Sequence, residues 1–277
     1  MAVPLPATIP ATEVQLIQSK YVKQAYRISV ALPISYRGKP RQRYPAVYLT
    51  DANWYFGLVT DLSRVLSRGA SLPEAIVVGI GYPVDESPGA IFPPIGPLRL
   101  RDMTPVVGRT RDEKSAKQRR ADRVETGGAS KFLRFIQSQL IPAIDAGYRT
   151  RPAHRILAGH SLGGLFALYV LFQQPKLFSG YIAGSPSLWY NDRVTFQHES
   201  RFARTHNALP VKLHLAVGEL EEEHPQSQMV SQLVQLAAQL ESRHYQGFSL
   251  TRQILPGCDH GSAIPQTFQA GLQAVLS

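Results

Sequence analysis

Ser161 lies in the segment Gly-His-Ser-Leu-Gly, between an apolar run typical of a strand and an apolar run typical of a helix. A tight turn between the two needs glycine on both sides of the serine, because a Cβ at Gly159 or Gly163 would collide with the adjoining backbone. Such a turn presents the Ser161 hydroxyl as a nucleophile at the end of the strand. The Leu162 N–H, at the N-terminus of the helix, is expected to stabilise the resulting oxyanion. The sequence therefore predicts nucleophilic chemistry at Ser161.

A serine nucleophile needs a general base, and the sequence offers 8 histidines. His260 follows the last expected strand and precedes the last expected helix, which is where this kind of site places its base. His160, next to the serine, is expected to point away from the hydroxyl and to pack around the turn, at the border of the substrate pocket. No pair among the remaining histidines has the spacing of a metal site, so neither a metal nor another cofactor is expected.

The acid that orients the histidine is expected after the strand at residues 211–217. The chain there carries several carboxylates within a few residues, so the choice is ambiguous from spacing alone. The usual offset from the strand-ending glycine favours Glu221, followed by Glu219 and then Glu222. The acid would accept the Nδ1 proton of His260 and stabilise the imidazolium that forms during attack. A solvated acidic turn is the alternative interpretation of this segment.

A second oxyanion donor is expected in the loop that follows the strand at residues 46–49. In that loop, residues 50–56, the backbone N–H of Ala52 or Asn53 is predicted to face the oxyanion. A further segment, residues 185–190, follows the strand after the serine helix and reaches the same edge of the sheet. Its aromatic side chains and those of the earlier loop either line the substrate pocket or pack in the core; they are Trp54, Tyr55, Trp189 and Tyr190.

Alternating strand and helix patterns predict the fold. Short apolar runs typical of buried strands occur at residues 46–49, 75–80, 155–158, 181–183 and 211–217. An alternating run at residues 26–32 predicts a half-buried strand near a sheet edge, and a last strand is expected near residues 248–255. Helices are expected after the serine and at residues 130–144, 228–245 and 265–276. This order predicts a mostly parallel doubly wound sheet flanked by helices, in a single domain spanning residues 1–277. Together with the strand, serine turn and helix around Ser161, it indicates an α/β-hydrolase fold.

The net charge of +10 is concentrated in one segment. Between residues 99 and 123, 9 Lys and Arg side chains face 4 Asp and Glu side chains, without apolar periodicity. Residues 99–128 are therefore predicted to form a long basic loop, either solvated or bordering the substrate entrance as a lid. Nucleic-acid binding is not expected, because the segment lacks interleaved aromatic residues and no nucleic-acid-binding module is recognisable.

Other sequence features bear on compartment and partners. The single cysteine, Cys258, excludes an internal disulfide and a cysteine-based zinc site. The N-terminal residues do not resemble a secretory signal, and no apolar run is long enough to span a bilayer. We therefore expect a cytoplasmic protein that acts on a small-molecule substrate and does not bind membranes. The sequence leaves its oligomeric state open.

Taken together, the motifs resemble the putative esterase branch of the α/β-hydrolases, the group related to esterase D that includes bacterial siderophore esterases. The matching segments lie at residues 48–51, 101–105, 159–168, 185–189, 217–221 and 259–262. The resemblance implies that Ser161 is the nucleophile, that His260 is the base and that the loop at residues 50–56 contributes to the oxyanion site. It also implies that Arg101 and Asp102 are structural or pocket residues. Asp51 precedes the nucleophile, so it is expected in the substrate pocket and not as the acid of the site. Two departures stand out: Ala52 replaces a frequent glycine, and the basic segment after residue 105 is unusually long.

These expectations combine into a serine esterase that cleaves carboxylic esters through an acyl-enzyme, with a Ser-His-Glu triad. Within the family, the basic segment favours anionic, siderophore-like substrates. An acyltransferase that uses the same acyl-enzyme is a mechanistic alternative. A hydrolase fold without catalytic activity, used to bind an acidic partner, is the alternative from another class.

Overall fold

The structure is a computed structural model that describes residues 8–69, 72–84, 92–108, 125–223 and 227–277. Its centre is an eight-stranded sheet with the strand order β1-β2-β4-β3-β5-β6-β7-β8. The strands are β1 (Thr12–Gln18), β2 (Ala25–Ala31), β3 (Tyr44–Thr50), β4 (Ile76–Gly81), β5 (Thr150–His160), β6 (Gly180–Gly184), β7 (Lys212–Gly218) and β8 (Ser249–Leu255). In sheet order, the six strands β4, β3, β5, β6, β7 and β8 run parallel. Strand β2 pairs antiparallel with both β1 and β4.

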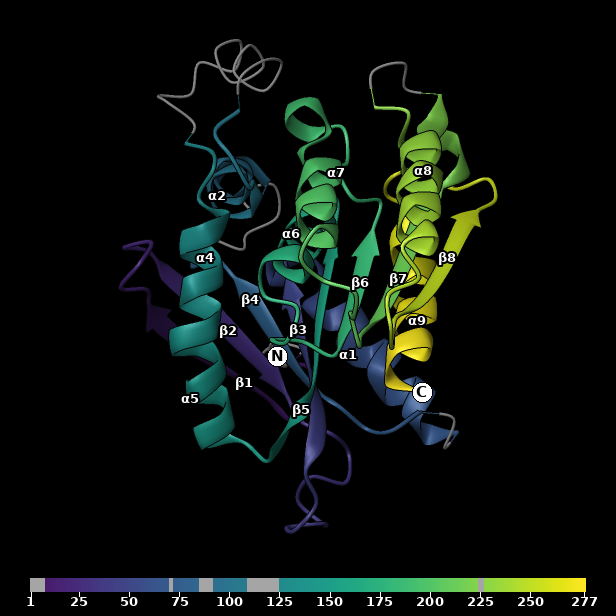
Figure 1. The fold of residues 1–277 in the computed structure, drawn as a ribbon. Coiled ribbons are helices and arrows are strands. Elements are labelled where there is room, and N and C mark those ends of the chain that lie inside the picture. The colour runs from purple at the N-terminus through teal and green to yellow at the C-terminus, as the bar shows by residue number, and fades with distance from the viewer. Residues whose placement is uncertain (1–7, 70–71, 85–91, 109–124, 224–226) are drawn as a thin grey trace, which may run out of the picture.

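Helices cover both faces of the sheet (Figure 1). On one face lie α1 (Ala52–Arg68) and α9 (Ala263–Leu276), which share a hydrophobic cluster with the strands. The larger cluster on the other face includes α2 (Phe92–Met103), α4 (Ala129–Phe135), α5 (Ile141–Gly147), α6 (Leu162–Gln173), α7 (Tyr190–Ala203) and α8 (Met229–Ser242). A π-helical turn, Ile136–Leu140, joins α4 to α5. Within the described residues, no helix is long and apolar enough to cross a membrane.

The middle of the sheet is buried on both faces, as its apolar runs predicted. All seven residues of β3 are buried, and so are all six of β4. Helix α6 is apolar around its whole circumference, because it lies between the sheet and α2, α4 and α7. The predicted α/β-hydrolase architecture, with its mostly parallel sheet, is confirmed.

Several boundaries differ from the sequence predictions. The edge strand β1 was not predicted, because its side chains are mostly exposed and give no buried apolar pattern. The expected loop at residues 50–56 was wrong beyond Asp51, since α1 begins at Ala52. Tyr55, Val59 and Leu62 recur there at helical spacing and pack toward the sheet.

The basic segment also begins differently from the prediction. Arg99 and Arg101 belong to α2, which ends at Met103, so the predicted loop over residues 99–128 was wrong at its start. These arginines pair with buried carboxylates, and Ile95 and Met103 of the same helix pack in the core. Most of the predicted basic loop, residues 109–124, lies outside the described residues.

A buried ionic cluster joins the end of α2 to β2 and β4. Asp102, fully buried, accepts hydrogen bonds from the Arg101 guanidinium at 2.7 and 2.9 Å. It also accepts hydrogen bonds from the hydroxyls of Tyr26 at 2.6 Å and Tyr82 at 3.2 Å. Burial, together with the Asp102 charge, raises the pKa of both tyrosines, so they remain neutral donors. The carboxylate is thus fully partnered, as a buried charge must be.

Asp102→Asn should lower the free energy of unfolding by about 3 kcal/mol, because it leaves the Arg101 charge without its buried partner. The measurement is urea denaturation followed by circular dichroism. The matched control is Glu241→Gln, which breaks the exposed 3.5 Å ion pair with Arg252 and should cost less than about 1 kcal/mol. Equal losses for the two variants would contradict a structural role for the cluster.

Candidate active site

The strand, turn and helix around Ser161 form as predicted. Ser161 has φ 61° and ψ −118°, between the end of β5 and the start of α6. A Cβ on Gly159 would lie 2.4 Å from the carbonyl oxygen of Gly163, and one on Gly163 would lie 2.4 Å from Oγ1 of Thr50. Only glycine fits at either position. The surrounding packing therefore holds Ser161 in a strained conformation.

Leu162 is the first residue of α6, so its N–H is among those that have no acceptor within the helix. The carbonyl of Ser161 accepts the N–H groups of Leu165 at 3.0 Å and Ser187 at 3.2 Å. The Ser161 N–H donates to the Gly184 carbonyl at 2.8 Å. The bonds to Gly184 and Ser187 anchor the turn to the end of β6 and to the segment that follows it.

Glu221 and His260 meet at the carboxyl edge of the sheet. Oε2 of Glu221 lies 2.5 Å from Nδ1 of His260. Oε1 of Glu221 accepts the Ser185 hydroxyl at 2.5 Å and the Gly218 N–H at 2.8 Å. Burial opposes the charged form of Glu221, but these hydrogen bonds hold the pKa of its carboxyl below the usual value. Glu221 is therefore a buried carboxylate that fixes the orientation of the imidazole.

Backbone contacts bring the two loops together. The Leu220 N–H donates to the Cys258 carbonyl at 3.0 Å. A Cβ on Gly218 would lie 2.3 Å from the Cys258 carbonyl oxygen, so this close approach requires glycine. On the other side of the histidine, Oδ1 of Asp259 accepts the N–H groups of Gly261 at 3.0 Å and Ser262 at 2.8 Å. The loop that carries the histidine is thus fixed at both ends.

The neighbouring carboxylates are engaged elsewhere. Glu219 accepts the Gly257 N–H at 2.8 Å, and Glu222 accepts the Ser231 N–H at 2.9 Å. Of the three candidate acids, all within the described residues, the structure therefore brings only Glu221 into contact with His260.

The ring of His160 packs against that of His260, with centroids 4.5 Å apart and planes inclined by 49°. This contact places His260 against the residue that precedes Ser161. His160 is 1% exposed, and Tyr55 approaches its ring edge-on at 6.2 Å. Burial, assisted by the charge of His260, lowers the pKa of His160 to about 3. His160 is therefore neutral at pH 7 and places no second positive charge beside the His260 ring.

Asp51 lies between the last residue of β3 and the first residue of α1. Its carboxylate is 1% exposed and forms a bidentate ion pair with Arg99, with distances of 2.6 Å to Nε and 3.0 Å to Nη2. The Arg99 guanidinium also lies 4.8 Å from the ring centroid of Trp54. The Asp51 carbonyl accepts the N–H groups of Trp54 at 3.0 Å and Tyr55 at 3.2 Å, which starts the helix.

Ala52 and Asn53 form the first turn of α1, not a loop as predicted. The Asn53 side chain pairs with the peptide of Tyr82: Nδ2 donates to its carbonyl at 2.9 Å and Oδ1 accepts its N–H at 2.7 Å. This pair joins the start of α1 to the end of β4. The two backbone N–H groups thus lie at a helix N-terminus, where an anion is favoured.

The remaining pocket predictions have different outcomes. Tyr190 is fully buried and its hydroxyl donates to the Val106 carbonyl at 3.0 Å, which supports core packing, one of its two predicted places, over the pocket wall. Arg101 belongs to the buried Asp102 cluster and has a structural position. Trp54 and Trp189 are partly buried at the edge of the core, and their contact with substrate stays a prediction.

Sequence reasoning missed two contacts of the site. Ser185 follows β6, the strand between the serine strand and the acid strand, so its position pointed to this edge. Arg99 was assigned to a basic loop, and its spacing from Arg101 gave no signal for a separate buried partner.

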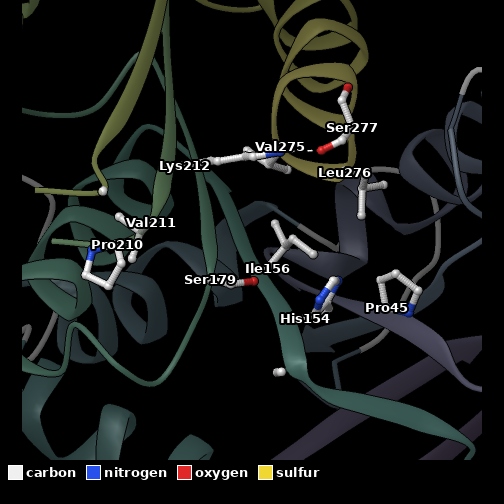
Figure 2. Close-up of a pocket in the computed structure, with 12 residues that line it drawn as sticks. Pro45, His154, Ile156, Ser179, Pro210, Val211, Lys212, Val275, Leu276 and Ser277 are labelled. Atoms are coloured by element: carbon white, nitrogen blue, oxygen red, sulfur yellow. Dashed lines mark hydrogen bonds between the residues drawn. The ribbon is translucent and has the colours of Figure 1, made fainter.

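A pocket of about 290 Å³ opens at the opposite edge of the sheet, near the strand N-termini (Figure 2). Pro45, Lys212 and Val275 line it, and the Lys212 side chain hydrogen-bonds the Ser277 carbonyl. This pocket is separate from the candidate active site, because Ser161, Glu221 and His260 are not among its lining residues.

The fold and the strand-turn-helix around Ser161 define an α/β-hydrolase. A family model described as "Putative esterase" matches residues 98–261. The ferri-bacillibactin esterase BesA of Bacillus subtilis (strain 168) is 33% identical over 274 residues, covering 97% of this chain and 91% of that protein. The siderophore triacetylfusarinine C esterase of Aspergillus fumigatus is 31% identical over 206 residues, covering 73% of this chain and 64% of that protein.

The BES protein from Bacillus cereus, a solved structure, has a TM-score of 0.84 and 26% identity to this chain, with 100% of both chains covered. The chain belongs to the putative esterase family. It is a carboxylic ester hydrolase, as its named relatives are esterases.

Burial of neutral His160 makes stability depend on pH. The unfolded chain binds a proton at this residue near the ordinary value of 6.5, whereas the folded protein does so only near pH 3. The contribution of neutral His160 to the free energy of unfolding is therefore fully present above pH 6.5 and is lost as the pH drops toward 3. His160→Gln should remove about 2 kcal/mol of the loss in unfolding free energy between pH 7 and pH 5.

Urea denaturation at the two pH values measures this difference. The control is His154→Gln, at an exposed position in β5, which should retain the wild-type difference. If His160→Gln showed the same pH dependence as the wild type, the neutral buried state of His160 would be wrong.

Proposed function

We propose that this esterase acts through an acyl-enzyme, with Ser161 as nucleophile, His260 as general base and Glu221 as the acid. The observation that carries the proposal is the 2.5 Å contact between Glu221 and Nδ1 of His260, beside the turn that holds Ser161. Contact through Nδ1 leaves Nε2 to exchange a proton with the serine. The three residues also follow one another in the chain in the order that this fold uses.

In the first step, His260 accepts the Ser161 proton while the oxygen attacks the ester carbonyl. The N–H of Leu162 and a first-turn N–H of α1, from Ala52 or Asn53, stabilise the tetrahedral oxyanion. His260 then protonates the departing alcohol, which leaves the acyl group on the serine. Water, activated by the same histidine, attacks the acyl-enzyme and releases the acid. Glu221 stays ionised and stabilises the imidazolium in both steps.

The proposed substrates are esters of siderophores. The relatives named above are esterases for ferri-bacillibactin and for triacetylfusarinine C, and the first covers nearly the whole chain. The net charge of +10 also favours anionic substrates, such as ferric complexes of catecholates. This attraction should weaken as salt screens the charges.

Ser161→Ala should abolish labelling by a fluorophosphonate and lower ester hydrolysis about a million-fold. Intact-protein mass spectrometry of wild type and variant measures the labelling. Hydrolysis of a ferric tricatecholate ester and of p-nitrophenyl butyrate, each at low and high salt, tests the substrate class. A labelled Ser161→Ala protein would refute the nucleophile, and salt-independent preference for the neutral ester would refute the anionic substrate.

A Glu-to-Gln series identifies the acid. Glu221→Gln should lower kcat by roughly a thousand- to ten-thousand-fold, because the amide cannot stabilise the imidazolium and favours the wrong tautomer. Glu219→Gln and Glu222→Gln are matched controls that should stay within about threefold of wild type, since their carboxylates bind other segments. A larger loss in either control than in Glu221→Gln would assign the acid differently.

A further inference from the structure

Two arginines of α2 hold buried carboxylates in the same bidentate manner, but only one of them does so against the serine turn. We propose that Arg99 is a positioning residue for ester hydrolysis, which holds the Asp51 carboxylate away from the first turn of α1 so that the substrate oxyanion can bind there. This inference rests on the proposed function, in which the N-terminus of α1 supplies an oxyanion donor. It assigns a catalytic consequence to a residue that itself touches neither the nucleophile nor the base.

The Arg99–Asp51 pair has the geometry of a rigid clamp. Nε and Nη2 of Arg99 contact separate carboxylate oxygens, at 2.6 and 3.0 Å. The Asp51 side chain is fully buried and that of Arg99 is 13% exposed, so water does not compete for the pair. The Trp54 ring, 4.8 Å from the guanidinium carbon, covers one side of it. A bidentate pair in such surroundings fixes the direction of the carboxylate.

Asp51 occupies the position from which an aspartate normally caps a helix. It is the residue before Ala52, and a capping side chain would accept N–H groups of the first helical turn. The helix dipole adds to this attraction. Here the Asp51 side chain makes no capping hydrogen bond, and the backbone adopts a left-handed conformation with φ 57°. The carboxylate is turned to Arg99 instead of to the N-terminus of α1.

The position of this carboxylate matters because it lies against the serine turn. A Cβ built on Gly163 would be 3.2 Å from Oδ2 of Asp51. Without Arg99, an ionised Asp51 would compete with the substrate for the first-turn donors and would repel an oxyanion formed at Ser161. Both effects act on the charge that develops in the transition state, so they should lower kcat more than they raise KM.

The second pair on α2 provides a matched control. Arg101 holds Asp102 through Nε and Nη2 at 2.7 and 2.9 Å, also with a buried carboxylate. The Asp102 carboxylate also accepts the hydroxyls of Tyr26, in β2, and Tyr82, which follows β4. Loss of this pair should destabilise the protein without placing a charge beside Ser161.

The experiment compares Arg99→Gln, Arg101→Gln and the double variant Arg99→Gln/Asp51→Asn in the full chain. The readouts are kcat and KM for p-nitrophenyl butyrate, the inhibition constant of an alkylboronic acid, and the melting temperature. The boronic acid forms a tetrahedral anionic adduct with a nucleophilic serine, so its affinity reports on the oxyanion site at equilibrium.

We expect Arg99→Gln to lower kcat and boronic acid affinity by about 10- to 100-fold, with KM changed less than about threefold. Arg101→Gln should lower the melting temperature but leave kcat and boronic acid affinity unchanged. The double variant should recover most of the loss of Arg99→Gln, because the neutral amide introduced by Asp51→Asn carries no charge into the oxyanion site.

Equal effects of Arg99→Gln and Arg101→Gln on kcat, or a double variant as slow as Arg99→Gln, would overturn the positioning role. In that case the proposed function would still stand, provided that wild type hydrolyses the ester and Ser161→Ala does not. If wild type neither hydrolysed the ester nor bound the boronic acid, the proposed function would fail, and this inference with it.

Discussion

The backbone of β5 and α6 approaches the end of β3 so closely at the serine turn that side chains are excluded. A Cβ on Gly159 or on Gly163 would lie only 2.6 or 2.4 Å from Oγ1 of Thr50. This contact fixes the position of Ser161 relative to β3, and therefore relative to Asp51 and the start of α1. Since β6 and β7 continue the same parallel sheet, Ser185 and the acidic turn reach the same edge. The site depends on this register more than on any single hydrogen bond.

Around that turn, each buried ionisable group is either paired or neutral. Glu221 has three hydrogen-bond donors, Asp51 has a bidentate arginine, and His160 loses its charge through burial. In the proposed mechanism, the residue left to change its protonation state is His260, whose side chain is 48% exposed. A site that must stabilise a transient negative charge gains from having its other charges already compensated.

The sequence predicted the features that follow from local rules. Glycines around a serine, apolar runs in central strands and chain order were sufficient to predict the turn at Ser161 and to select Glu221 and His260, which lie in contact. Local rules failed where partners are distant in sequence. The edge strand β1 has one neighbour and no buried pattern. The first turn of α1 follows Thr50 and Asp51 and contains Asn53, residue types that are also typical of turns. Tyr190 could not be assigned from its type, because only its contact with Val106 places it in the core.

The two arginines of α2 show why charge patterns alone do not assign function. Arg99 and Arg101 are two residues apart, and both were counted in one basic segment expected to attract anions. In the folded protein each is neutralised by a buried carboxylate, so neither adds to long-range attraction in the way that an exposed arginine would. Their difference comes from what lies behind the carboxylate: a pair of tyrosines for Asp102, and the serine turn for Asp51. The same chemical pair therefore lies against two tyrosines at one position and against the serine turn at the other.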